Sequence, residues 1–248
     1  MKLTDFFERT YVVNLPERQD RRRDISKELA NVGISLAPNS VEIFPAVRPE
    51  TAGEFPSIGA WGCFLSHLSI LKNARQQNLS NVLVMEDDLA ISPTLIAQQS
   101  ALIEQLQGQD WGMVYLGHYL TDRNLPKVDP NGRSPEAAVL LKPYSLAIQT
   151  THFYAVNGQI LDRLIAFLEQ VQQRPKGHPD GGPMHVDGAY STFRAQNPDI
   201  MTLIAEPNLG WQRSSRSDIN ASAWYDYVPL VREVANVARG AKVWLSNK

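Results

Sequence analysis

Cysteine is almost absent from this sequence, and histidine is scarce. Cys63 is the single cysteine among 248 residues, so no disulfide can form within the chain and a zinc–cysteine site is excluded. The five histidines include no His-x-His or similar pair. A metal-dependent phosphohydrolase usually gathers several histidine and aspartate ligands around two ions. The composition therefore disfavours that class.

Long apolar segments and a strong excess of one charge are absent as well. The formal net charge is -2, which gives no indication of a nucleic-acid partner. No apolar run approaches the ~20 residues that a membrane-spanning helix needs. The first residues also lack the basic and then apolar pattern of a signal peptide. We therefore expect a soluble protein of the reducing cytoplasm, with no transmembrane segment.

Strand-like and helix-like segments alternate along most of the chain. This alternation predicts an α/β layered fold with a mainly parallel central sheet. We expect a single domain over residues 1–248, with a C-terminal helical tail at about 222–248. Strands are expected at residues 10–15, 40–47, 81–85, 111–117, 137–143, 145–156 and 200–207. Helices are expected at 17–33, at 58–77, from 93, at 160–171 and from 187.

Three consecutive carboxylates, Glu86, Asp87 and Asp88, follow the predicted strand at 81–85. Neighbouring carboxylates repel one another unless a cation or hydrogen-bond donors compensate. They fit a solvated loop, or a site for Mg²⁺ or Mn²⁺, which take oxygen ligands and often a phosphate. The triplet lies at the carboxyl end of its strand, where ligands gather in open α/β sheets. On a regular strand Glu86 and Asp88 share a face and Asp87 points away, unless the chain turns.

The predicted helix at 58–77 carries polar residues beside an apolar stripe. Ser66 lies off the stripe and His67 lies on its edge. A histidine in such a helix is more often structural than functional. Two glycines, Gly59 and Gly62, allow another backbone or a ligand to approach closely.

Four stretches of the chain together resemble the motifs of glycosyltransferase family 25, which includes bacterial lipopolysaccharide β-galactosyltransferases and collagen galactosyltransferases. In chain order they are YVVNLPERQDRR, GAWGCFLSHLSIL, VLVMEDDLAIS, and VDGAYSTF followed by QRSSRSDIN. They span residues 11–219 and occur in family order. The resemblance implies a GT-A type fold, a UDP-sugar donor and a Mn²⁺ or Mg²⁺ ion. Galactose is the sugar that the family favours, and glucose stays open.

The resemblance also implies roles for the residues of these stretches. Asp88 would bind the metal, Asp87 is a second candidate, and Glu86 would orient the ribose or the turn. Ser66 and His67 would face the donor. The residues at the end of the first strand that would bind the donor are Asn14, Arg18, Arg21 and Arg22.

The family mostly inverts the anomeric centre, which requires one general base and no covalent sugar intermediate. Asp187 is the candidate base, and the alternative is that it only caps the helix that follows. His185 is a rival as base or as a further metal ligand. His152 fits a site-lining role and a structural role equally. Gly188 departs from the aromatic residue that family members often carry after this aspartate, which leaves acceptor geometry open.

The expected function is transfer of a hexose from a UDP-sugar to a hydroxyl of a glycan, or of a glycolipid acceptor of the lipopolysaccharide type. Two alternatives are a degenerate relative that binds nucleotide-sugar without turnover, and a metal-dependent phosphohydrolase. The irregular segments at 118–136 and 174–185 are expected to recognise the acceptor. Contact with a membrane surface would then be peripheral, through the acceptor.

Overall fold

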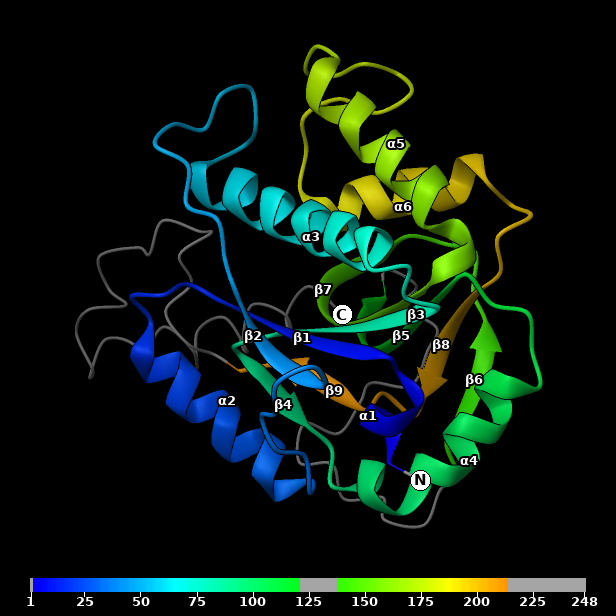
Figure 1. Cartoon of the computed structure of the whole chain (residues 1–248). Coiled ribbons are helices and arrows are strands. Elements are labelled where there is room, and N and C mark those ends of the chain that lie inside the picture. Colours follow the sequence, from blue (N-terminus) through cyan, green and yellow to red (C-terminus); the bar gives the residue numbers. More distant parts are fainter. Residues whose placement is uncertain (1, 121–137, 214–248) are drawn as a thin grey trace, which may run out of the picture. The chain divides into compact units, whose positions relative to one another are not determined.

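The computed structural model describes residues 2–120 and 138–213 (Figure 1). Residues 118–120 of the expected loop at 118–136 continue strand β5 (Met113–Leu120) instead. The rest of that loop, the Ser-Asp-Ile stretch at 217–219 and the helical tail at about 222–248 lie outside the described residues. The strands are β1 (Arg9–Asn14), β2 (Val41–Pro45), β3 (Asn81–Glu86), β4 (Leu89–Ile91), β5 (Met113–Leu120), β6 (Leu140–Pro143), β7 (Ile148–Asn157), β8 (Thr202–Glu206) and β9 (Gly210–Gln212). The helices are α1 (Leu3–Phe6), α2 (Gln19–Asn31), α3 (Ile58–Gln76), α4 (Thr94–Gln107), the 3₁₀ turn η1 (Gly158–Ile160), α5 (Leu161–Gln173) and α6 (Val186–Gln196).

The described strands form one nine-stranded sheet, with the order β2-β1-β3-β7-β5-β8-β6 and with β9 joining β5 to β4. β1 pairs in parallel with β2 and β3, and β5 pairs in parallel with β8 and β9. β7 is antiparallel to both β3 and β5, so these two strands share a direction. Only β4, β6 and β7 of the described strands run against the others. The expected α/β fold with a mainly parallel sheet is therefore confirmed.

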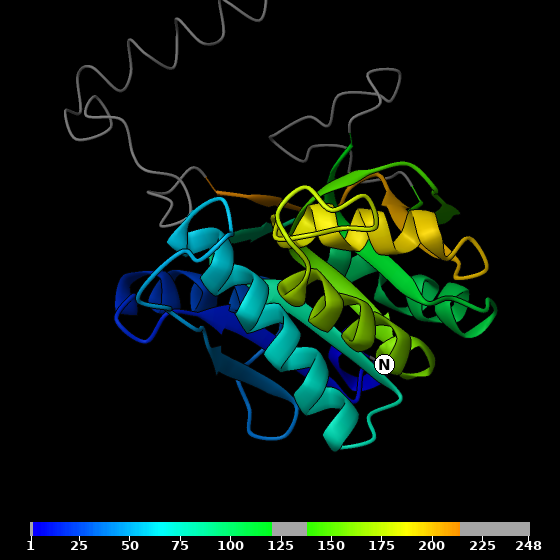
Figure 2. The same ribbon diagram turned by 90° about the horizontal axis from the view of Figure 1, so that it is seen from above.

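Helices cover both faces of the sheet and divide the core into two parts (Figure 1). α3, α5 and α6 pack side by side on one face, as Figure 2 shows. Their core includes Phe64, Leu68, Leu164 and Tyr190. α1, α2 and α4 cover the other face, over a second core. The expected inward residues of α4 are all buried there: Leu95, Leu102, Ile103 and Leu106.

Two helix ends follow the expected capping chemistry. The Ser57 hydroxyl accepts a hydrogen bond from the backbone N–H of Ala60 at 3.0 Å, and α3 begins there. α2 ends before Gly33, whose φ of 72° is left-handed. The N–H groups of Gly33 and Ile34 then bond to carbonyls of the last turn of α2, which is a Schellman motif.

The chain turns directly after the acidic triplet begins. β3 ends at Glu86, Asp87 and Asp88 form a turn, and β4 runs back to pair with β9. The sequence predicted neither β4 nor β9, each of which has three residues. Their pairing brings Gln212 and Arg213 beside the triplet, although they lie more than 120 residues away along the chain. No helix in the described ranges combines the length and apolar character that crossing a bilayer requires.

Candidate active site

The turn sends the three carboxylates of the triplet to different partners. Glu86 points to the α3 side of the sheet, where Oε1 accepts a hydrogen bond from the Thr151 hydroxyl at 2.7 Å. Its Oε2 accepts one from the Gln212 amide at 3.1 Å. His67 Nε2 lies 3.5 Å from Oε1. Burial alone would raise the pKa of Glu86, but His67 and Thr151 bring it down to about 2, so this carboxylate is charged at neutral pH.

Asp87 is buried and held on the opposite side by the first strand and α2. Its Oδ2 accepts a hydrogen bond from Asn14 at 2.7 Å, and Oδ1 accepts one from Arg21 at 3.0 Å. The Arg213 guanidinium donates to the Asp87 carbonyl at 2.8 Å. Burial still raises the pKa of Asp87, against the opposing effect of Asn14 and Arg21. Both carboxylate oxygens are engaged, so Asp87 ties β3 to β1 and α2.

Asp88 is the member of the triplet that has an unused oxygen. Its Oδ1 is buried without a hydrogen-bond partner among the described residues, and its Oδ2 lies 3.8 Å from Arg21. Burial and the nearby Glu86 raise the pKa of Asp88 to about 7. Such an oxygen is costly to leave unpaired, and a cation would satisfy it. The predicted metal assignment thus fits Asp88 better than Asp87.

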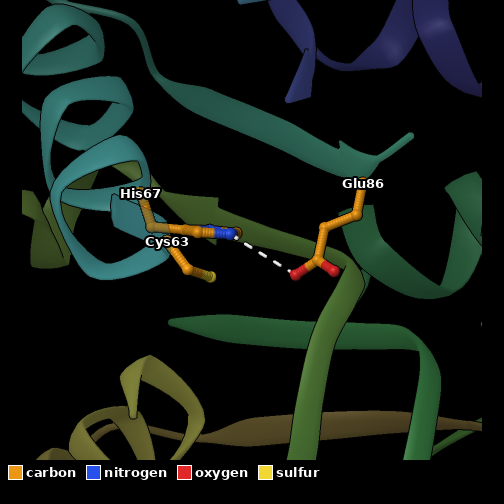
Figure 3. Close-up of side chains that lie close together, drawn as sticks. All are labelled: Cys63, His67 and Glu86. Carbon is orange, nitrogen blue, oxygen red and sulfur yellow. Dashed lines mark ion pairs between the residues drawn. The ribbon is translucent and has the colours of Figure 1, made fainter. Parts of the chain in front are cut away.

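A buried chain of polar side chains runs from Glu86 into the core. His67 is fully buried, and its Nδ1 lies 2.8 Å from the Tyr154 hydroxyl. The Tyr154 hydroxyl lies 2.9 Å from that of Tyr190. Figure 3 shows the other side of the imidazole directed at Glu86, with Cys63 beside it. His67 was expected on the edge of the apolar stripe, but the packing of α3 against the sheet buries it completely.

Asp187 lies in the first turn of α6 and is fixed by backbone groups. Its Oδ2 accepts a hydrogen bond from the Thr150 N–H at 3.0 Å, and its Oδ1 accepts one from Gly188 at 2.8 Å. The N-cap position belongs to His185 instead, without a side-chain cap bond. Thr150 has a φ of 70°, an outlier for a β-branched residue, and such strain gathers at functional sites.

Three carboxylates affect the thiol of Cys63. Burial raises the pKa of this thiol first, and Glu86, Asp187 and Asp88 raise it further. The thiol therefore lies within electrostatic range of residues from the acidic triplet and of Asp187. Cys63, Thr151, Gln212 and Arg213 also belong to the site around the triplet, and the sequence analysis assigned none of them. Cys63 belongs to the GAWGCFLSHLSIL stretch, whereas Thr151, Gln212 and Arg213 reach the site only through long-range packing.

Other predicted residues have structural partners. The buried Ser66 hydroxyl donates to the Gly62 carbonyl and accepts from the Val47 N–H, so it holds the segment after β2. His152 contacts the Gly210 carbonyl with Nε2 at 3.0 Å and the Thr150 hydroxyl with Nδ1 at 2.7 Å. Both ring nitrogens are thus engaged, as in the structural interpretation of His152. The expectation that Ser66 faces the donor finds no support in these contacts.

Of the predicted basic residues after β1, two form ion pairs within the protein and one is exposed. Arg18 forms two hydrogen bonds with Asp20, at 3.0 and 2.9 Å. Arg21 reaches the triplet, while Arg22 is exposed. Asn14 and Arg22 line a hollow of about 250 Å³ next to the triplet's partners. His185 is exposed at the start of α6.

A larger hollow, of about 1030 Å³, lies at the other end of the sheet. It is lined by the last turns of α3, the start of β3 and the end of β7, and it contains none of the predicted site residues. Ligands of α/β sheets bind at the carboxyl ends of the parallel strands. We therefore place the candidate active site at the triplet, where the buried oxygen of Asp88 lies.

The comparison with known families agrees with the geometry of this site. A family model described as "Glycosyltransferase family 25 (LPS biosynthesis protein)" matches residues 7–173, more than half of the sequence. The chain belongs to glycosyltransferase family 25. The match includes α3 and the acidic triplet and ends before α6, so it covers Asp88 but not Asp187.

Family 25 relatives include proteins named as active enzymes and proteins named as inactive. Procollagen galactosyltransferase 2 of Homo sapiens is 24% identical over 232 residues, which cover 82% of this chain and 34% of that protein. Procollagen galactosyltransferase 1-B of Xenopus laevis is 27% identical over 129 residues, 45% of this chain and 21% of that protein. Inactive glycosyltransferase 25 family member 3 of Homo sapiens is 27% identical over 129 residues, which cover 45% of this chain and 22% of that protein. The chain thus spans about a fifth to a third of the relatives' length.

Proposed function

We propose that this family 25 chain is a metal-dependent, inverting glycosyltransferase of the GT-A type. It moves a hexose from a UDP-sugar to an acceptor hydroxyl on a glycan or on a glycolipid of the lipopolysaccharide type. Galactose is the sugar favoured by the relatives' names. The observation that carries the proposal is the buried, unpaired Oδ1 of Asp88 at the carboxyl end of β3.

A divalent cation suits the residues around Asp88. Besides burial, the neighbouring carboxylates of Glu86 and Asp87 raise the pKa of Asp88. Arg21 lies near both Asp87 and Asp88 and supplies one positive charge for the two. Carboxylate oxygens are the ligands that Mg²⁺ and Mn²⁺ prefer, so Asp88 would hold the ion. Bound there, the ion would neutralise charge on the departing nucleotide.

The protein's own residues divide the remaining work. Asp87, held by Asn14 and Arg21, fixes the turn that presents Asp88. Arg22 borders the hollow next to Asn14 and is exposed. Its guanidinium can bind two phosphate oxygens of the donor. Asp187 is the proposed base, and the bonds from Thr150 and Gly188 hold its carboxylate in one orientation.

A second candidate is a relative that binds a nucleotide-sugar without transferring the sugar. The match to a protein named inactive supports it. The presence of Asp187 in addition to Asp88 argues for turnover, because a binding protein needs no base. A cytoplasmic location and peripheral membrane contact through the acceptor belong to the leading proposal.

Turnover of a donor panel tests the proposal. Released UDP is measured with UDP-galactose and UDP-glucose, with Mn²⁺, and with and without glycan acceptors. We expect acceptor-stimulated release with at least one donor. Binding of a donor without any release would favour the second candidate. Formation of UMP and a sugar phosphate, with or without an acceptor, would favour a phosphohydrolase. If the protein binds none of the nucleotide-sugars, both nucleotide-sugar proposals are contradicted.

A further inference from the structure

A cysteine, a histidine and a carboxylate converge beside the proposed donor site. The side chains are Cys63 and His67, from adjacent turns of α3, and Glu86, from the end of β3 (Figure 3). Their ligand atoms, Sγ, Nε2 and a carboxylate oxygen, all lie within 4.8 Å of one another. The spacing of four residues puts Cys63 and His67 on one face of the helix, and that face meets Glu86.

The geometry points to a second metal site, formed by Cys63, His67 and Glu86, that takes a zinc-class transition-metal ion. Tetrahedral zinc with bonds to nitrogen, oxygen and sulfur places its ligand atoms roughly 3.3–3.6 Å apart. The distance from His67 Nε2 to Glu86 Oε1 is 3.5 Å. A small rotation of the Cys63 side chain completes the three-ligand set. The expectation that a single cysteine excludes a zinc–cysteine site holds for sites built from several thiols, and this mixed set departs from that expectation.

His67 has an unsatisfied nitrogen, which is the independent sign of a ligand. The side chain is fully buried, yet Nε2 has no hydrogen-bond partner within the described ranges. Its 3.5 Å contact with Glu86 lies beyond the usual length of an N–H···O bond, especially a charge-assisted one. A buried ring nitrogen without a partner is costly. A metal ion between Nε2 and Oε1 would satisfy this nitrogen, while Oε1 keeps its hydrogen bond from Thr151.

The partner on the other side of the ring suits a metal-binding histidine. Nδ1 lies 2.8 Å from the Tyr154 hydroxyl, which lies 2.9 Å from the Tyr190 hydroxyl. When Nδ1–H donates to Tyr154, and Tyr154 donates to Tyr190, Nε2 carries the lone pair that a metal needs. Metal-binding histidines usually have such a second partner. Thr151 and Gln212 orient Glu86 in the same way.

This site differs from Asp88 in the ion that it selects. Thiolate and imidazole favour zinc over magnesium or manganese, whereas carboxylates alone favour the latter. Cys63 and Glu86 are partly exposed while His67 is buried. An ion can therefore reach the site from solvent, and three protein ligands would leave a fourth position for water. Bound there, it would link α3 to the end of β3.

Cobalt binding tests the site, independently of any transferase activity. The full chain, freed of metals by a chelator, is titrated with Co²⁺ while near-ultraviolet absorption is followed. We expect a thiolate-to-cobalt charge-transfer band that saturates at one equivalent and disappears when Zn²⁺ is added. Because Cys63 is the only cysteine, Cys63→Ser must remove the band. Glu86→Gln should weaken cobalt binding roughly tenfold or more.

A control variant and a second measurement keep the result unambiguous. Asp88→Asn should keep the cobalt band, because this change affects the proposed Mg²⁺ or Mn²⁺ site at Asp88 and leaves Cys63, His67 and Glu86 unchanged. In the unchanged protein, Zn²⁺ should slow alkylation of Cys63 by iodoacetamide at least about tenfold, which requires no variant to fold. Absence of the band up to about 1 mM Co²⁺, or an alkylation rate unaffected by Zn²⁺, would overturn the proposal.

Discussion

The acidic triplet and the larger hollow differ in how their charged groups are paired. At the carboxyl end of β3, Asp88 Oδ1 and His67 Nε2 are buried and lack hydrogen-bond partners among the residues described. At the amino end, the larger hollow is lined by charges that pair with one another, such as Lys72 with Glu169 at 2.6 Å, and Arg75 with Asp162. The size of a hollow is therefore a poorer guide to chemistry here than a buried carboxylate oxygen without a partner at the carboxyl end of a parallel strand, since paired surface charges need no ligand. Other buried atoms without partners in the described ranges, such as Thr10 Oγ1 at the start of β1, lie away from that position.

The largest expected effect comes from removing the proposed base at the carboxyl end. Asp187→Asn should lower the transfer rate by roughly 10²- to 10⁴-fold, because the acceptor hydroxyl loses its proton acceptor. Donor affinity and melting temperature should change little, since asparagine keeps an oxygen for the bond from Thr150. Steady-state kinetics, with UDP binding measured separately, resolve the two quantities.

A matched aspartate at the amino end sharpens that comparison. Asp110→Asn changes an exposed residue that lines the larger hollow, and transfer should stay within about twofold of the unchanged protein. If Asp187→Asn transfers nearly normally, the base assignment moves to His185, and His185→Ala should then lower the rate instead.

Two glycines, one near each end of the sheet, lie against a backbone carbonyl and allow the two ends to be compared by mutation. A Cβ on Gly62 would lie 2.5 Å from the Val47 carbonyl, and a Cβ on Gly158 would lie 2.5 Å from the Leu79 carbonyl. Each change to alanine should destabilise the fold by about 1–3 kcal/mol through overpacking, measured by chemical denaturation. Gly62→Ala alone should also weaken donor binding, because it displaces α3 near His67. Equal donor affinity in both variants would contradict the link between α3 and the site.

The smallest effect is expected for the ion pairs of the amino end. Lys72→Ala removes the pair with Glu169, in which both side chains are about half exposed. Exposed pairs contribute about 0–1 kcal/mol, so stability should fall by no more than that, and transfer should be unchanged. A large loss of transfer would show that the amino end takes part in function and would break the comparison.

Much of the fold follows from local patterns in the sequence. β3 could be predicted from its apolar run, α3 from its cap at Ser57, and the end of α2 from Gly33. β4 and β9 could not be predicted, because three residues carry no periodicity. Their pairing depends on a contact between segments more than 100 residues apart.

The site was predictable to the extent that its chemistry is local. Three adjacent carboxylates after a strand predict a cation site, and the structure gives each carboxylate different partners. That Asp88 keeps a free oxygen while Asp87 does not depends on Asn14 and Arg21. His67 was expected at the edge of an apolar stripe, but α3 packs against the sheet and against two helices, which buries it. Thr151 and Gln212 reach Glu86 only in the folded chain, and no local signal marks them.

The central claim is that Asp88 holds a cation that UDP needs for binding, and cation-dependent UDP binding tests this claim most directly. Calorimetry with the unchanged protein should show UDP binding in Mn²⁺ and its loss in excess chelator. Asp88→Asn should weaken Mn²⁺-dependent binding by roughly 10²-fold or more, because the ion's charge is worth several kcal/mol, whereas Asp110→Asn should bind normally. UDP affinity that is equal with and without Mn²⁺, or equal in Asp88→Asn and the unchanged protein, would contradict the account.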